Sequence, residues 1–452
     1  MKTKLKTNKG ITLIALVITI IVLLILAGVS ISMLTGENGL LTKASESKQA
    51  TEKAGAKEAV EVEVLGSFTN NGNYDKNKVR ENLKKNLKIP ARDIKDNRDG
   101  SLDVKYKEVE LEVKKDGEVV YKGEGGGSTG TLPSTADTTP FLPEGAIQVP
   151  GTNLDNGLTI KDANGNEWVW IEVPKSIYSN TTYNIDGDNK PSSSTDYENI
   201  EAVMHEYTKT YRNGTTYTDT WYPEAQHGFA SANEYNNHKN KMLESVYKNG
   251  GFYIGKYEVG TETLRNTENA QLTTPVIKEG AYPYNYVTIK QAQEKATDLS
   301  TGEKTSSLMF GVQWDLVLKH IETKKGKTVQ ELTQDSSSWG NSYNSKFVIE
   351  KGEYSENYEN TFTPVPGNYS KNTNKSVLLT TGATDRNSTL NIYDLAGNVD
   401  EWTLEYTSNT GNPCASRGGC FYNDGSTSPS SGRACTITTS SHSGIGFRPA
   451  LY

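Results

Sequence analysis

The sequence Tyr393-Asp-Leu-Ala-Gly-Asn-Val-Asp-Glu-Trp402 is followed by Arg417-Gly-Gly419 and, close to the end of the chain, by Gly446-Phe-Arg448. Any one of these motifs alone is weak evidence for a particular fold, but the three in this order are specific evidence. A Gly pair allows backbone angles that a Cβ atom forbids, as expected where a strand turns beneath a loop. Together these motifs decide the fold of the C-terminal part of the chain.

This ordered set resembles the formylglycine-generating enzyme (sulfatase-modifying factor) family, whose domain is a variant of the C-type lectin fold. Earlier landmarks of the same resemblance are Glu167–Val173, Gly251–Val259 and Val287–Ala296. The resemblance covers residues 144–452 and implies an α+β module. The residues that it implies to be structural are Trp402, Arg417, Gly418, Gly419 and Arg448.

The apolar stretch Gly446–Tyr452 predicts a short strand at the end of the chain, and that strand needs a partner. The apolar run Glu167–Val173 could supply one, which would bring the two ends of the module together as the resemblance implies. Between them, residues 286–296 and 313–321 have the apolar spacing of amphipathic helices.

The reactive residues of the family are not all present in this chain. Formylglycine-generating members carry two copper-binding cysteines at fixed places beyond the Ser of an Arg-Gly-Gly-Ser motif. Here that Ser is Cys420, and the two places hold Asn423 and Ser428. Neither side chain can be a thiolate ligand, so the sequence predicts no bound copper, no oxidase chemistry and no catalytic residue.

The turn Asp394–Glu401 is the best candidate for a bound ion. Ca²⁺ prefers hard oxygens, and a tight Gly turn can direct carboxylates and carbonyls inward together. An alternative is that the turn only supports the fold, with Glu401 pairing an arginine of the later motifs. The calcium ligands implied by the resemblance are the side chains of Asp394 and Glu401 and the carbonyls of Gly397 and Val399; the family commonly has Asn where this chain has Asp394.

The loops between Arg417 and Phe447 are rich in Tyr, Asn, Ser, Thr and Gly. Such a mixture offers adaptable hydrogen bonding with a few rigid aromatics, and it resembles a paratope. It also falls where the lectin-fold variable proteins of diversity-generating retroelements carry their changing residues, although polar loops are common on surfaces. The candidate ligand-binding residues are Tyr422, Asn423, Asp424, Ser426, Ser428, Thr436, Thr438, Ser440 and His442.

All three cysteines, Cys414, Cys420 and Cys435, lie near the C-terminus. In an oxidising compartment one disulfide could form and leave one free thiol, with Cys420 and Cys435 as a candidate pair. Three reduced structural thiols are the alternative.

The N-terminus contains an uncharged stretch, residues 11–34, preceded by four lysines and no acid. As a helix rising ~1.5 Å per residue it would span the ~30 Å apolar layer of a bilayer. The positive-inside rule then keeps the leader cytoplasmic and places the rest of the chain outside. The sequence therefore predicts a single-pass membrane protein with an extracytoplasmic C-terminal part. A secretory signal peptide and an ordinary anchor are the alternatives.

The junction at Gly10 and Ile11 resembles the cleavage site of a type IV prepilin. This resemblance implies removal of the leader, a methylated N-terminus at Ile11, and packing among other pilin or pseudopilin subunits. The fifth residue of a mature pilin is usually Glu, whereas here it is Ala15. A buried amine would lack that partner, which favours a minor or tip subunit over a major one.

The region after the apolar stretch predicts a small domain and a linker. Helix formers continue to residue 65, and alternating runs in residues 66–122, with a hairpin at Lys114–Gly117, predict a small sheet. Residues 123–143 are rich in Gly, Ser, Thr and Pro, which is typical of a flexible linker. The predicted order is a leader (1–10), a pilin-type transmembrane helix (11–65), a small β domain (66–122), a linker (123–143) and the lectin-fold module (144–452).

Composition limits the function classes. The net charge of −7 provides no basic field, so no nucleic acid is expected as a physiological ligand. The sequence predicts an α+β, cell-surface, pilin-like protein whose non-catalytic C-type lectin-fold module binds an unknown glycan or protein ligand. The alternatives are an extracytoplasmic modifying enzyme of the formylglycine-generating family and a structural minor pilin or pseudopilin.

Overall fold

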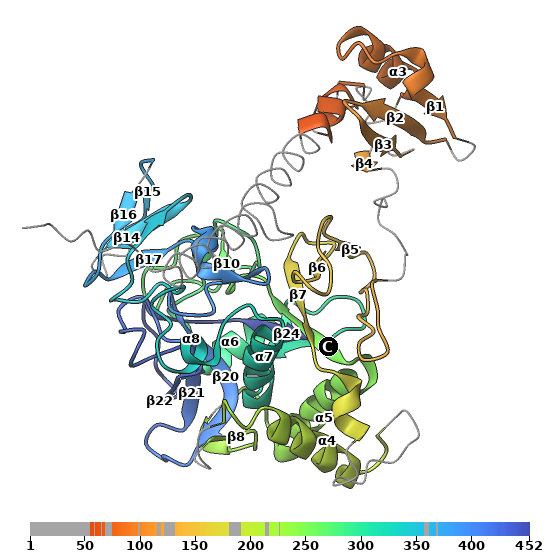
Figure 1. Cartoon of the computed structure of the whole chain (residues 1–452). Helices are drawn as coiled ribbons and strands as arrows, with labels where there is room; N and C mark the ends of the chain where they lie inside the picture. The colour runs from red at the N-terminus through yellow and green to blue at the C-terminus, as the bar shows by residue number, and fades with distance from the viewer. Residues whose placement is uncertain are drawn as a thin grey trace, which may run out of the picture. The chain divides into compact units, whose positions relative to one another are not determined.

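A computed structural model of the chain describes residues 55–452, except residues 58, 65, 68–74, 98–99, 115–118, 122–131, 180–190, 213–216, 226, 357–360 and 368. The chain divides into two compact units, Met1–Gly126 and Gly127–Tyr452 (Figure 1). Each has a hydrophobic core of its own.

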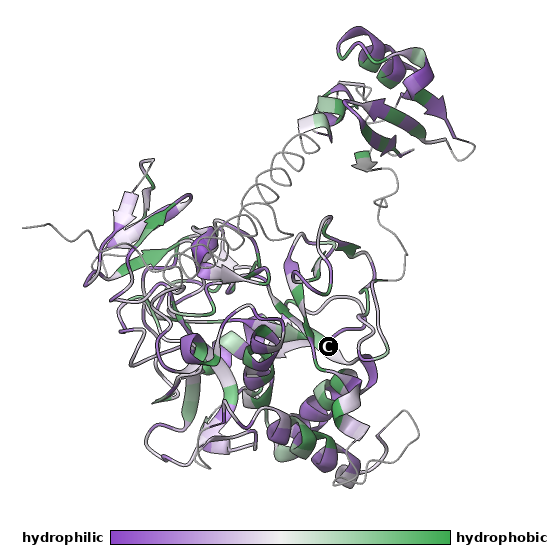
Figure 2. Ribbon diagram, viewed as in Figure 1, coloured by the Kyte–Doolittle hydropathy of each residue, from purple (hydrophilic) through white to green (hydrophobic). Residues whose placement is uncertain are grey.

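The described residues correct the predicted fold class and location. Among them, no helix has the length and apolar character needed to cross a membrane. The longest helix with printed bounds, α5 (Ala232–Asn249), carries Glu, Lys and Asn along its length, and Figure 2 shows mixed hydropathy on the helices. The prediction of a single-pass membrane protein with a pilin-type helix is therefore wrong for the described chain, which is α+β. Gly10, Ile11 and the stretch 11–34 lie outside the described residues.

The first unit confirms the predicted small sheet. Residues 55–57 and 59–64 are helical, and α3 begins after Asp75, whose carboxylate accepts hydrogen bonds from two amides of the first turn. Alternate residues of β2 and β3 are buried, which gives the sheet one apolar face. The elements are α3 (Lys76–Lys85), η1 (Ala91–Asp93), β1 (Ile94–Asp96), β2 (Leu102–Tyr106), β3 (Val109–Val113) and β4 (Val119–Tyr121), with the strands antiparallel in sequence order.

The second unit is built around a six-stranded sheet. Its order is β12-β24-β9-β7-β6-β5, so the last strand of the chain lies inside the sheet. The predicted direct pairing of the terminal strand with Glu167–Val173 is wrong, because β9, a fully buried strand, lies between them. The strands are β5 (Ile147–Gln148), β6 (Thr159–Lys161), β7 (Glu167–Glu172), β9 (Gly251–Gly255), β12 (Ser306–Leu308) and β24 (Pro449–Leu451).

A second sheet, called the motif sheet below, carries the three C-terminal motifs around Trp402, Arg417 and Phe447. Its order is β22-β21-β20-β23, and β8 pairs with the far end of β20. The pairing of β20 with β23 is parallel and sets Trp402 opposite Phe447, so the first and last motifs are adjacent. The strands are β8 (Tyr217–Thr218), β20 (Asp400–Thr407), β21 (Cys414–Arg417), β22 (Arg433–Thr436) and β23 (Ile445–Phe447).

Helices pack against these sheets, and the two predicted amphipathic helices are confirmed as α6 and α7. Thr288 caps α6 through a capping box, and both carboxylate oxygens of Asp219 accept the first amides of α7, at 2.6 and 2.9 Å. The helices are α4 (Ser194–Tyr207), α5 (Ala232–Asn249), α6 (Ile289–Thr297), α7 (Gly311–Thr323) and α8 (Val329–Thr333), with 3₁₀ turns η2 (Lys175–Ser179), η3 (Pro223–Ala225) and η4 (Asp385–Asn387).

Short strands complete the loops of the second unit. They are β10 (Gly260–Thr261), β11 (Tyr282–Pro283), β13 (Phe347–Ile349), β14 (Glu353–Glu356), β15 (Thr363–Pro364), β16 (Tyr369–Lys371), β17 (Val377–Leu379), β18 (Ser388–Thr389) and β19 (Ile392–Tyr393).

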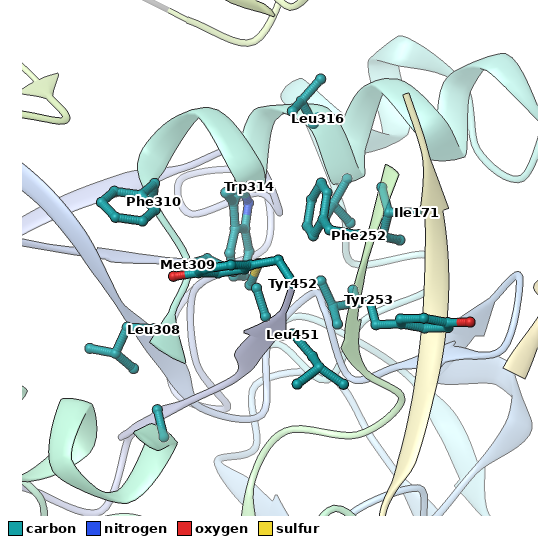
Figure 3. Close-up of a cluster of buried hydrophobic side chains, with 14 of the residues drawn as sticks. Ile171, Phe252, Tyr253, Leu308, Met309, Phe310, Trp314, Leu316, Leu451 and Tyr452 are labelled. Atoms are coloured by element: carbon teal, nitrogen blue, oxygen red, sulfur yellow. The ribbon is translucent and has the colours of Figure 1, made fainter. Parts of the chain in front are cut away.

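The core of the second unit lies between α7 and the six-stranded sheet. Figure 3 shows Trp314 of α7 beside Phe252 of β9 and the terminal residue Tyr452, all of which are buried. Burying such large aromatic side chains contributes strongly to stability and fixes α7 on the sheet. The terminal strand is thus part of the core that holds the motif sheet in place.

The predicted linker is shorter than residues 123–143. Thr138 is fully buried, donates to the carbonyl of Gly250 at 2.9 Å and accepts from Trp170 Nε1 at 2.8 Å. Phe141 packs edge-on against Trp170 and Tyr253. Residues 132–143 therefore belong to the second unit, because hydrogen bonds and aromatic contacts outweigh a composition typical of linkers.

Candidate functional site

Two buried ion-pair clusters hold the motif sheet. The Arg448 guanidinium binds the Glu401 carboxylate at 2.7 to 3.1 Å and also donates to the carbonyls of Gly255 and Tyr393. Because Gly255 lies in β9 and Glu401 in β20, this arginine connects the two sheets. Trp402 donates to the carbonyl of Val287 at 3.0 Å. The structural role expected of Arg448 and Trp402 agrees with these contacts.

The second cluster surrounds Arg417. This fully buried guanidinium binds Asp315 of α7 at 2.8 Å and Glu405 at 3.2 Å. Arg433 of β22 binds the same two carboxylates, at 2.6 and 3.0 Å. Charges buried at this density are stable only when they are paired. The cluster therefore fixes β21 and β22 against α7, and with them the loop that joins the two strands.

Glycines shape that loop. Gly418 and Gly419 have φ values of +91° and +72°, a region that favours Gly over other residues. A Cβ atom on Gly419 would lie 2.6 Å from the carbonyl oxygen of Ser428. The Gly pair is what lets the chain fold back beneath residues 422–428, as the sequence predicts.

A pocket of about 230 Å³ opens beside this loop, at the edge of the motif sheet. Five of the nine predicted ligand-binding residues line it: Tyr422, Asn423, Ser428, Thr436 and His442. The other lining residues are Asp400, Ser416, Gly419, Thr427, Gly432, Arg433, Ala434, Cys435 and Ile445.

The remaining four predicted residues, Asp424, Ser426, Thr438 and Ser440, do not line the pocket. Asp424 Oδ1 accepts from Asn344 Nδ2 and from the amide of Ser426, each at 2.9 Å. Its carboxylate therefore closes a turn. Ser440 takes part in a backbone turn with Ile437. A polar composition alone does not distinguish residues that close loops from residues that face a pocket.

One wall of the pocket is a Tyr–His pair. Tyr422 Oη lies 3.3 Å from His442 Nδ1, and the amide of Gly444 donates to the same nitrogen at 3.2 Å. Burial lowers the pKa of His442, so its imidazole is neutral at pH 7. Because Nδ1 accepts hydrogen bonds, the ring proton is assigned to Nε2. Gly444 is required here, since a Cβ atom on it would lie 2.4 Å from the Tyr422 ring.

Thiols adjoin the pocket, and all three cysteines of the chain are free. Cys420 is buried and donates to Asn423 Oδ1 at 2.9 Å, whereas Cys435 is exposed and lines the pocket. The candidate disulfide between Cys420 and Cys435 is therefore absent in this structure. The buried thiol is instead directed at the amide that stands at one of the family's cysteine positions.

Asp400 is the pocket residue that sequence reasoning missed. Burial raises the pKa of its carboxyl to about 7, while a hydrogen bond from the Gly419 amide acts in the opposite direction. It occupies the unspecified position in the motif Gly-Asn-Val-x-Glu-Trp. The available signal was an acid directly before Glu401, within a motif that is otherwise largely apolar.

The candidate calcium turn is strongly buried. Asp394 Oδ2 accepts the amide of Gly382 at 2.8 Å, but Oδ1 has no hydrogen-bond partner among the described residues. Glu258, which the sequence analysis did not single out, also has one carboxylate oxygen without a partner there. Burial raises the pKa of Glu258, with the charge of Asp394 adding to it. Because unpaired buried carboxylate oxygens are costly, this group fits a cation.

A Glu–His–Asp group elsewhere has ligand atoms within 4.8 Å of one another: Glu201, His205 and Asp219. However, Lys239 Nζ already binds Glu201 at 2.7 Å and the carbonyl of Asp219 at 2.9 Å. The Asp219 carboxylate caps α7, as described above. We read this group as a structural ion-pair cluster.

Residues 224–451 match the sulfatase-modifying factor enzyme 1-like domain, just over half of the chain. The chain belongs to this family. The resemblance inferred from the motifs is thereby confirmed for that range. Residues before 224 are part of the same fold, since β5 to β7 share a sheet with β9 and β24. The prepilin-like site at Gly10 and Ile11 lies outside both the match and the described residues.

Among solved structures, Treponema denticola variable protein 1 is similar over 44% of this chain and 84% of that one, with 14% identity and a TM-score of 0.26. No curated protein matches the chain.

Proposed function

We propose that the second unit binds a polar ligand in the pocket beside the Gly418–Gly419 loop, and that it does so without oxidising cysteine. The observation that carries this proposal is the identity of two pocket residues, Asn423 and Ser428. They stand where the formylglycine-generating members hold their copper-binding cysteines. An amide and a hydroxyl can donate and accept hydrogen bonds but cannot bind copper as thiolates.

The lining supports recognition of a polar molecule. Hydroxyls of Ser416, Thr427 and Thr436, together with one amide side chain and one neutral imidazole, surround a volume of about 230 Å³. Such a volume is below that of typical drug-sized sites, which begin at about 300 Å³. It suits one amino-acid side chain or one small sugar, so a glycan or a protein segment is the proposed partner.

We further propose Ca²⁺ as a structural cofactor of the neighbouring turn. The side chain of Asp394 and the carbonyls of Gly397 and Val399 would hold it, and Glu258 adds a buried oxygen without a partner among the described residues. Glu401, the fourth expected ligand, is bound through both oxygens by Arg448, so its carboxylate would lie beside the ion as part of that pair. The ion would supply positive charge to carboxylates that Arg448 alone does not balance. Its role there is to hold the loop that leads into β20.

The experiment uses Cys435 as a reporter, because it is the exposed thiol of the pocket. The rate of its alkylation by iodoacetamide in the full chain is measured by mass spectrometry, with and without a panel of small sugars and tripeptides. The proposal expects at least one of these molecules to slow the reaction at Cys435 while the buried thiols stay unreactive. If none alters the rate at concentrations up to millimolar, the pocket is not a binding site.

A second candidate function is modification of a cysteine-containing peptide, and the exposed Cys435 in the pocket is the observation that favours it. The two functions differ in a direct assay. The full chain is incubated in air with copper, a thiol reductant and a cysteine-containing sulfatase peptide, so that O2 is the oxidant, and the peptide mass is followed. Conversion of the peptide thiol to an aldehyde, lost in a Cys435→Ser variant, would establish the enzyme and overturn the binding proposal.

A further inference from the structure

The charges around the pocket are unequal, and this inequality restricts the ligand. The lining contains one acidic and one basic side chain that can carry a full charge, Asp400 and Arg433. Whether each side chain is free to bind a ligand decides which ligand charge the pocket favours.

Arg433 is already committed to other partners. Its Nε binds Glu405 at 3.0 Å, one Nη binds Asp315 at 2.6 Å and the other donates to the carbonyl of Tyr211 at 2.8 Å. Just 7% of its side chain is exposed. A guanidinium held by two buried carboxylates has little charge left to offer, so the pocket does not favour an anionic ligand.

Asp400 differs from Arg433 both in its partners and in its exposure. Its carboxyl accepts a hydrogen bond from the Gly419 amide, and this donor carries no charge. Among the residues that the structure describes, no Lys, Arg or His forms an ion pair with it. It is partly exposed, at the wall of the pocket. When it is ionised, the Asp400 carboxylate is therefore the charge of the lining that lacks a counter-ion within the described residues.

The other polar groups around Asp400 suit a cation as well. Tyr422 lines the pocket, and an aromatic ring can attract positive charge to its face. Ser428 and Thr436 can accept hydrogen bonds from N–H groups, and the neutral His442 imidazole does not repel a cation. The pocket volume of about 230 Å³ fits an extended alkyl chain ending in such a group.

We infer that the ligand of this pocket carries an organic cation, an ammonium or a guanidinium group, and that the Asp400 carboxylate is the residue that binds it. The inference rests on the proposed function, because it names the class of ligand for the same pocket. The cation could be a free amine or a Lys or Arg side chain of a peptide, and the recognising chemistry is the same for both.

The experiment compares probes that differ only in charge. Alkylation of Cys435 in the full chain is followed with the tripeptide Gly-Lys-Gly, with its neutral analogue Gly-norleucine-Gly, and with n-butylammonium. We expect Gly-Lys-Gly to protect Cys435 at concentrations about tenfold or more below those needed with the norleucine peptide, since charged hydrogen bonds are the stronger ones. Equal protection by n-butylammonium assigns recognition to the ammonium group alone, whereas protection by the tripeptide only assigns it to a peptide-borne side chain.

Two variants test whether Asp400 supplies the charge that binds the cation. Asp400→Asn keeps an oxygen for the Gly419 amide but removes the charge, so the preference for Gly-Lys-Gly should disappear. Asp298→Asn is the matched control, because it removes one exposed acid that lines a separate groove of about 960 Å³. That variant should behave as the unaltered chain does. Thermal unfolding followed by circular dichroism verifies that both variants are folded.

The outcomes separate the inference from the proposed function. If the norleucine peptide protects as well as the lysine peptide, the pocket binds ligands but the cation inference is wrong, and this test needs no variant. An unchanged preference in a folded Asp400→Asn variant overturns the inference too. If no probe of either charge alters the rate, the proposed function itself fails.

Discussion

Arg448 shows how much of this fold depends on single buried charges. Replacing it with Met would leave Glu401 without its partner in the interior, between β20 and β9. We expect the free energy of unfolding to fall by about 3–5 kcal/mol, the usual effect of breaking a buried ion pair. Urea unfolding of the variant, monitored by Trp fluorescence, measures this loss.

The control is the double variant Arg448→Met with Glu401→Gln, which removes both charges. Because no uncompensated charge remains, it should be more stable than the sum of the two single losses implies. Strict additivity, or a loss below about 1 kcal/mol for Arg448→Met alone, would contradict the structural role given to this pair.

Buried histidines make the stability depend on pH. Burial lowers the pKa of His227 and His238 to about 4 and that of His320 to about 3, from an ordinary 6.5. Between these values the unfolded chain binds protons that the folded chain does not, so stability is present above pH 6.5 and is lost as the pH falls. For His320 alone the loss at pH 5 is about 2 kcal/mol.

A His320→Asn variant isolates that contribution. We compare its free energy of unfolding with that of the unaltered chain at pH 7 and pH 5, by urea titration. The variant should lose about 2 kcal/mol less between the two pH values, whatever its absolute stability. Parallel pH dependences in the two proteins would show that His320 titrates normally in the folded state.

At the residue scale, sequence motifs predicted where the pocket lies but not the acidic residue in its wall. Tyr422, Asn423 and His442, which composition predicts as ligand-binding, do line it, because the β21–β22 loop that follows the Gly pair meets the β22–β23 loop there. Asp400 was not predicted, because the motif indicated a function only for the positions that form the fold. Its exposure depends on how β20 lies beside the loop, which a sequence does not reveal.

At the scale of elements, the turn before β20 leaves no room for a side chain at Gly397. Gly397 has φ of +79°, and a Cβ atom there would lie 2.2 Å from the carbonyl oxygen of Asn341. We expect Gly397→Ala to cost at least about 3 kcal/mol, since the strained φ and the backbone clash add. Thermal and urea unfolding measure the effect.

Gly151→Ala is the matched control for that prediction. Gly151 also has φ of +79°, but a Cβ atom on it meets nothing within 4 Å. Its substitution should cost only the conformational strain, about 1–2 kcal/mol. Equal losses for the two variants would mean that the contact with Asn341 is unimportant.

The same turn carries the proposed calcium site. A ligand that binds only the folded state stabilises it, by about 2.7 kcal/mol at a concentration 100 times its dissociation constant. We therefore expect Ca²⁺ to raise the unfolding temperature of the chain and EGTA to lower it, with Mg²⁺ much less effective. In Asp394→Ala the Ca²⁺ effect should be lost, and an unchanged response in that folded variant would exclude the site.

Local patterns predicted most elements but not their order in the sheets. The alternation in 102–113 and the helical spacing in 286–296 and 313–321 all gave elements that the structure contains. The position of β24 between β12 and β9 could not be predicted, because the pattern of a short buried segment does not specify its neighbours in a sheet. The packed segment 132–143 was mistaken for linker because its buried contacts come from residues distant in sequence.

At the scale of the whole molecule, two units with separate cores should unfold separately. The first is held by residues such as Val79 and Leu111, the second by the core around Trp314. We expect a fragment of residues 127–452 to unfold at the same temperature as the corresponding transition of the full chain, in calorimetry. A fragment that is unfolded or clearly less stable would show that the first unit supports the second.

The central claim is that the pocket beside Gly418 and Gly419 binds a ligand through Asp400. A crystal structure of the full chain with Gly-Lys-Gly tests it most directly. The account predicts density for the peptide in this pocket, with the Lys Nζ within hydrogen-bond distance of the Asp400 carboxylate. Peptide density in the larger groove that Asp298 lines, or an empty pocket at saturating peptide, would contradict it.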